Sequence, residues 1–122
     1  MSGSKRPVRL LLTGQAKEEY ALLREVVEAQ RKKGIANSEE IQLLKSIDNK
    51  VELLKSNPVY GQSVPKKLIP NTLDVDNLFL VELTGYWRML YTLKTNQIEV
   101  VSFVLYIVDH KAYDKIFGYK FR

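Results

Sequence analysis

The side chains of this chain that could do chemistry are those of arginine, lysine, histidine, tyrosine and the carboxylates. Cysteine is absent and His110 is the single histidine, so the sequence offers no thiolate nucleophile and no cysteine-rich or multi-histidine metal site. It also has no glycine-rich phosphate loop and no serine elbow. The remaining side chains suit phosphodiester cleavage without a metal, in which a ribose 2′-hydroxyl attacks the adjacent phosphate and cations neutralise the developing charge.

Arg88 is the first candidate for such a cation. It lies in an apolar stretch that reads as a strand, on the face opposite Met89 and Tyr91. An arginine in an apolar strand needs a partner. The guanidinium could bind the scissile phosphate through two parallel hydrogen bonds, or it could pair with Glu82 across the tight turn between two strands.

A second group of candidates follows the last predicted strand. His110 could act as general acid for the leaving 5′-oxygen, because histidine titrates near neutral pH, or it could be an exposed polar residue that caps the tail. Lys111 is a neighbouring cation. Tyr113 and Tyr119 could stack on a splayed base, or they could anchor the tail to the core.

Lys66 and Lys67 lie in a long predicted loop over residues 57–77, which contains three of the four prolines of the chain. Loops of this length are unusual in a compact domain and often carry function. The two lysines could add positive charge to an RNA-binding site, or they could be a solvated surface pair.

The overall charge agrees with an anionic partner. Lysine and arginine exceed the acids by 19 to 14, a net charge of +5, and nucleic acid and then an acidic protein are the partners that such an excess favours. A lysine- and glutamate-rich surface also suits a thermophile that binds neither. The strongest apolar run, 100–108, is too short to cross a membrane, and the N-terminus lacks a signal-peptide core. We expect a cytoplasmic protein with no membrane partner and no cofactor.

Two periodicities predict the elements that position these residues. Apolar residues recur at helical spacing over 16–33 and 38–56, and the short link between the two stretches indicates an antiparallel helical hairpin. Shorter apolar runs read as strands. These predicted strands cover residues 8–13, 78–83, 87–93 and 98–108. The sequence therefore predicts an α+β fold of order β-α-α-β-β-β, with the helices packed on a mostly antiparallel sheet and a short C-terminal tail over 111–122.

Residues 1–122 are enough for one domain and one core. We expect a single domain, with residues 1–6 as a disordered end or a remnant of cloning.

Three stretches then show a resemblance. Residues 85–91, Gly-Tyr-Trp-Arg-Met-Leu-Tyr, place an aromatic residue before arginine, two aliphatic residues and tyrosine on the third predicted strand. Residues 109–113, Asp-His-Lys-Ala-Tyr, follow the last strand, and residues 57–61, Asn-Pro-Val-Tyr-Gly, leave the helical hairpin. With the order of elements, these stretches resemble the RelE/ParE toxin superfamily.

The resemblance implies a function. RelE-type members are endoribonucleases that cut mRNA in the ribosomal A site and are held inactive by a cognate antitoxin, here expected to be acidic. The arginine of the motif belongs to their active site, which implies a catalytic role for Arg88. RelE-type members place a catalytic arginine near the position of His110 and Lys111, and some relatives place a histidine there.

The sequence also departs from the RelE pattern. RelE carries lysines on the strand where this chain has Leu80 and Glu82, so either Lys66 and Lys67 supply that charge from the loop or the site is degraded. Two alternatives follow. ParE-type members share the fold but inhibit DNA gyrase by binding, without catalysis. A non-toxic member would only bind RNA or a partner protein.

Overall fold

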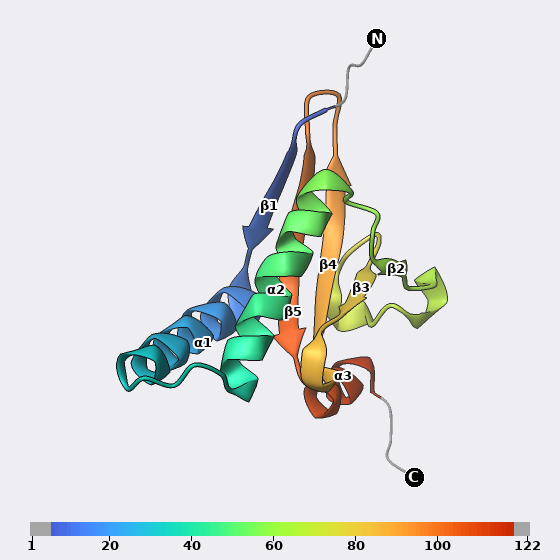
Figure 1. The fold of residues 1–122 in the computed structure, drawn as a ribbon. Helices are drawn as coiled ribbons and strands as arrows, with labels where there is room; N and C mark the ends of the chain where they lie inside the picture. Colours follow the sequence, from blue (N-terminus) through green and yellow to red (C-terminus); the bar gives the residue numbers. More distant parts are fainter. Residues whose placement is uncertain (1–5, 119–122) are drawn as a thin grey trace.

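The computed structural model describes residues 6–118, which form an α+β fold with a five-stranded mixed sheet of order β1-β5-β4-β3-β2 (Figure 1). The predicted fold class is confirmed. The helices and strands are β1 (Val8–Leu12), α1 (Gly14–Lys32), α2 (Glu39–Ser56), β2 (Gln62–Ser63), β3 (Phe79–Glu82), β4 (Arg88–Thr95), β5 (Val100–Val108) and α3 (His110–Phe117). Three short 3-10 turns complete them: η1 (Lys66–Leu68), η2 (Asn71–Leu73) and η3 (Thr84–Tyr86).

The sheet is mixed because β1 pairs in parallel with β5, starting from Val8 opposite Val100, whereas all other neighbours are antiparallel. The pairing of β4 with β5 shifts after Leu90, which lies opposite Tyr106, because Tyr91 lies opposite Val104. Leu105 is therefore an extra residue on β5, and such a bulge bends the strand and increases its twist.

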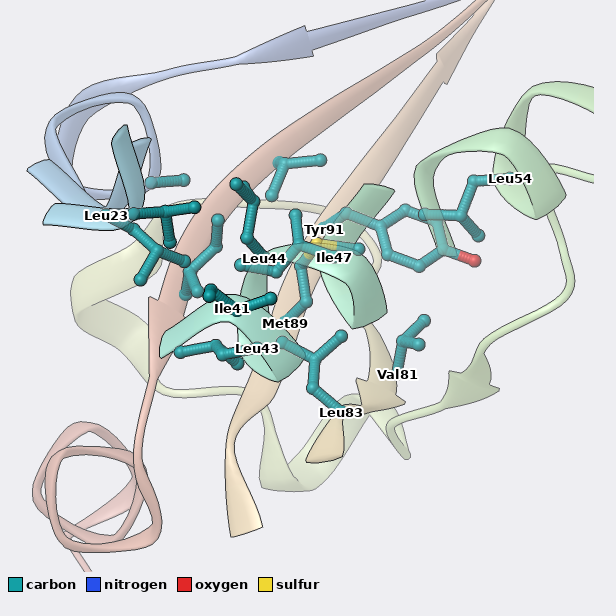
Figure 2. Close-up of a cluster of buried hydrophobic side chains, with 14 residues drawn as sticks. Leu23, Ile41, Leu43, Leu44, Ile47, Leu54, Val81, Leu83, Met89 and Tyr91 are labelled. Atoms are coloured by element: carbon teal, nitrogen blue, oxygen red, sulfur yellow. The ribbon is translucent and has the colours of Figure 1, made fainter. Parts of the chain in front are cut away.

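Helices α1 and α2 cover one face of the sheet, as the periodicity predicts (Figure 1). The Ser38 hydroxyl accepts a hydrogen bond from the Ile41 amide at 3.0 Å, which caps the start of α2. Figure 2 shows Met89 and Tyr91 of β4 among the apolar side chains of α2. Burial of these side chains is the main source of stability for the domain.

The opposite face of the sheet is also buried in part. Leu90 points away from α1 and α2, yet it is fully buried. Asn77, at the end of the long segment between β2 and β3, holds that segment to β4. Its amide accepts hydrogen bonds from the Leu93 amide and the Thr92 hydroxyl, both at 2.8 Å, and donates one to the Leu93 carbonyl at 3.0 Å. The predicted loop is therefore tied to β4 at its C-terminal end.

Tyr91 fixes the chain between α2 and β2 from inside the core. Its hydroxyl donates to the Pro58 carbonyl at 2.7 Å and accepts from the Gly61 amide at 3.0 Å. Burial raises the pKa of the Tyr91 phenol, although the hydrogen bond from Gly61 opposes that rise. A Cβ atom on Gly61 would lie 2.8 Å from the Tyr91 hydroxyl oxygen, so the chain passes the ring here only without a side chain.

The C-terminal end of the chain differs in part from the prediction. The segment expected to be a tail contains a third helix, α3, which Asp109 caps by accepting from the Ala112 amide at 2.9 Å and which ends at Gly118, with φ of 72°. At the N-terminus residues 1–5 lie outside the described residues, whereas Arg6 donates to the Asn96 carbonyl. None of the helices within residues 6–118 is long and apolar enough to span a membrane.

Candidate functional site

The candidate site is built around Arg88, the first residue of β4. Its register partners are Glu82 on β3 and Val108 on β5, and its side chain points away from α1 and α2 as alternation predicts. The guanidinium carbon lies 4.6 Å from the centroid of the Tyr113 ring, a cation–π contact that connects β4 to α3. Arg88 is half-buried, so solvent reaches part of the residue.

The alternative partner of Arg88 is Glu82, which lies directly opposite it. Within residues 6–118, however, Arg88 forms neither an ion pair nor a hydrogen bond with Glu82. The ion pairs of this part of the chain join Arg9 to Glu99, Lys32 to Glu28 and Lys55 to Glu52. The guanidinium is therefore held by an aromatic ring, and its donors are not used by a carboxylate of the described chain.

His110 lies at the same end of the sheet, as the first residue of α3 (Figure 1). Its ring meets the Tyr86 ring edge-on, with 6.1 Å between the centroids and 69° between the planes. Tyr86 has a positive φ of 64°, which a residue with a bulky side chain rarely adopts, and its side chain is 77% exposed. Lys111, beside His110, is exposed. The structure thus places Arg88 against Tyr113 of α3, and it places His110 of the same helix against Tyr86 in the turn before β4.

Tyr106 is a residue of this site that the sequence analysis missed. It lies opposite Leu90, one step along the face that carries Arg88 and Val108, and it is half-buried. The apolar run over 100–108 read only as a buried strand. The signal was the two-residue spacing from Val108, because every second residue of a strand shares one face.

Lys66 and Lys67 lie elsewhere, at the exposed turn η1. Lys66 lines a hollow of about 260 Å³ that includes neither Arg88 nor His110. The other residues that line this hollow are Ile69, Pro70, Asn71, Asp74 and Val75. The last predicted site residue, Tyr119, lies outside the described residues.

Two larger hollows lie along the helices. One, of about 540 Å³, lies between α1 and α2 and includes Tyr20, whose hydroxyl donates to Asp48 at 2.7 Å. The other, of about 620 Å³, lies between the two helices and η3 and includes Trp87. Between residues 6 and 118, no three histidine or carboxylate side chains gather as a metal site would require.

The sequence matches no known family model and no curated protein. A solved structure, the YoeB/ParE toxin from Agrobacterium tumefaciens, has a similar fold, with a TM-score of 0.56 over 84% of this chain and 98% of that chain. The two sequences are 11% identical, so the likeness concerns the fold and not the site. The strands, helices and sheet described above therefore form a fold similar to that of a YoeB/ParE toxin.

Proposed function

We propose that this chain is the toxin of a toxin–antitoxin pair, and that it is a metal-independent endoribonuclease that cleaves mRNA on the ribosome. The observation that carries the proposal is Arg88, which stands on the ring of Tyr113 with no carboxylate partner among the described residues. The fold, which is similar to that of a YoeB/ParE toxin, supports the same class of function.

In this mechanism Arg88 binds two oxygen atoms of the scissile phosphate and stabilises their charge as the 2′-hydroxyl attacks phosphorus. The P–O5′ bond breaks, which leaves a 2′,3′-cyclic phosphate and a 5′-hydroxyl. His110 donates the proton that the leaving 5′-oxygen takes up. Lys111 adds positive charge, and the rings of Tyr113 and Tyr119 stack on bases beside the cleaved bond.

Substitution of Arg88 tests the mechanism. Arg88→Ala should lower the rate of cleavage of ribosome-bound mRNA by roughly two to three orders of magnitude, because the loss of one charge-stabilising group costs about 2.7–4 kcal/mol of barrier. Growth arrest and primer-extension mapping measure the effect. Arg9→Ala is the matched control, since it removes the same charge from an arginine that already pairs with Glu99. Equal cleavage by Arg88→Ala and Arg9→Ala would contradict the proposal.

His110→Ala should cost less than Arg88→Ala in the same assay. A general acid must be protonated, so its contribution falls as pH rises, and the substitution should flatten the alkaline limb of the pH–rate profile. EDTA, at a concentration that leaves ribosomes intact, should leave the rate of cleavage of ribosome-bound mRNA by the purified protein unchanged. A rate that EDTA abolishes would contradict metal-independent cleavage.

A second candidate function is inhibition of DNA gyrase by binding. It is favoured by the finding that Arg88 does not line the hollow that Lys66 lines, because a binding surface does not need its cations to converge on one phosphate. Growth arrest with intact mRNA would support this candidate. No arrest at all would support the third reading, a non-toxic protein that only binds RNA or another protein.

The proposed partner is a cognate antitoxin of acidic character, because the chain carries a net charge of +5. Pull-down from the native cell should recover a small acidic protein. Recovery of ribosomes or gyrase without such a protein would contradict this part of the proposal.

A further inference from the structure

The groove of about 620 Å³ between α1, the start of α2 and η3 has an apolar floor that solvent can reach. Leu23 and Leu43 are buried at its base, whereas Leu22, Val26 and Tyr86 are 59%, 43% and 77% exposed. Exposed apolar side chains that share one groove are a common mark of a protein-binding surface. This groove includes none of Arg88, His110, Lys66 and Lys67.

The rim of the groove is acidic, in contrast to the net charge of +5. Its charged lining residues are Glu19, Glu39 and Glu40, and no lysine or arginine lines it. Glu40 accepts a hydrogen bond from the Gln30 amide at 2.9 Å, which lowers its pKa and keeps it ionised. Burial and then the charge of Asp109 raise the pKa of Glu19. Negative charge is therefore gathered here without a compensating cation among the lining residues.

We propose that this groove binds an amphipathic helix of a partner protein, and that lysine or arginine residues flank the apolar ridge of that helix. An apolar ridge fits the exposed floor, in the usual mode of a helix in a groove. Cations on the flanks would meet the three carboxylates of the rim. The inference does not depend on RNA cleavage, since neither Arg88 nor His110 lines the groove, although Tyr86 lines it and also meets the His110 ring.

Two other occupants fit less well. An acidic helix would set its carboxylates against Glu19, Glu39 and Glu40. In a symmetric dimer with a second copy of this chain, the acidic rims of the two grooves would face each other. Like charges that face each other oppose association. A partner that is acidic overall can still bind here if its docking helix is locally basic.

Trp87 allows binding to be measured directly, because it is the only tryptophan of the chain and lines the groove. The probes are two synthetic helical peptides with the same leucines at positions i, i+3, i+4 and i+7, one flanked by lysines and the other by glutamates. The lysine peptide should shift the Trp87 emission and bind roughly tenfold more tightly than the glutamate peptide. Equal or tighter binding of the glutamate peptide, or no binding of either, would overturn the proposal.

Variants locate the binding. Leu22→Ser with Val26→Ser should weaken binding of the lysine peptide roughly tenfold or more. Both side chains are exposed, so the double variant should still fold. Leu53→Ser is the matched control, a 40% exposed leucine of α2 outside the groove. Circular dichroism checks the fold of each variant.

A second variant tests the charge. Glu19→Gln with Glu39→Gln should remove the preference for lysine over glutamate flanks, while apolar binding remains. An unchanged preference would contradict the role of the rim. Sedimentation of the wild type without peptide tests the second-copy alternative. A dimer that Leu22→Ser with Val26→Ser abolishes would show that a second copy covers the groove, and would overturn the proposal.

Discussion

Arg88 and Tyr91 lie on the same strand, β4, and point to opposite faces of the sheet. The guanidinium of Arg88 lies against the Tyr113 ring of α3, in reach of solvent. The hydroxyl of Tyr91 is buried instead, and it bonds to two backbone groups of the segment after α2. One strand therefore serves both the candidate site and the chain that leaves the helical hairpin.

Removal of that buried hydroxyl tests how much it stabilises the fold. Tyr91→Phe leaves the Gly61 amide and the Pro58 carbonyl without their partner, so we expect the free energy of unfolding to fall by about 1–3 kcal/mol. The stack of the ring on Phe79, at 5.2 Å, should remain. Urea denaturation measures the change, with Tyr60→Phe as control because the Tyr60 ring is exposed. Equal midpoints for the two variants would show that the buried hydrogen bonds contribute nothing.

At the scale of elements, α3 carries three residues of the candidate site, His110, Lys111 and Tyr113, and Asp109 caps the start of α3. Asp109→Ala removes the hydrogen bond to the Ala112 amide, which typically costs about 0.5–2 kcal/mol of helix stability. We expect this variant to lower RNA cleavage while the urea midpoint of the domain changes little. Asp109→Asn removes the same charge but keeps a capping oxygen, so it should retain more activity than the alanine variant. Equal loss in both would assign the effect to the charge and not to the cap.

The elements with clear periodicity were predictable from the sequence. Helix α1 begins at Gly14 and α2 at Glu39, close to the predicted starts, because their apolar stripes are long. Helix α3 was missed because eight residues give too short a stripe, although Asp109 at its start and Gly118 at its end are ordinary cap signals. The segment after α2 shows no such periodicity, because single hydrogen bonds to β4 hold it. Tyr91 bonds to Pro58 and Gly61, and Asn77 bonds to Leu93, and each pair is distant in sequence.

At the scale of the whole molecule, the candidate site was predictable only in part. Alternation along β4 gave the correct face for Arg88, which depends on local geometry alone. The contact of Arg88 with Tyr113 depends on where α3 lies relative to the sheet. Periodicity in the sequence does not predict the direction of the chain after β5. The acidic groove could not be predicted from the sequence either, because it lies between α1, α2 and η3, which are far apart in the sequence.

The parallel pair of β1 and β5 joins the first strand of the chain to the last. Arg9 and Glu99, which pair at 2.9 Å, are 90 residues apart, so β1 has no partner in the sheet until the ribosome has made β5. At about 5–20 residues per second, the ribosome makes β5 roughly 5–20 s after β1. During that interval α1 and α2 have no complete sheet to pack on. A ribosome-bound chain that stops at Thr95 should therefore be cut rapidly by protease, and one that extends well beyond Val108 should resist. During synthesis, each new molecule thus has a period in which its apolar helix faces are open to chaperones or to a partner that binds before folding is complete.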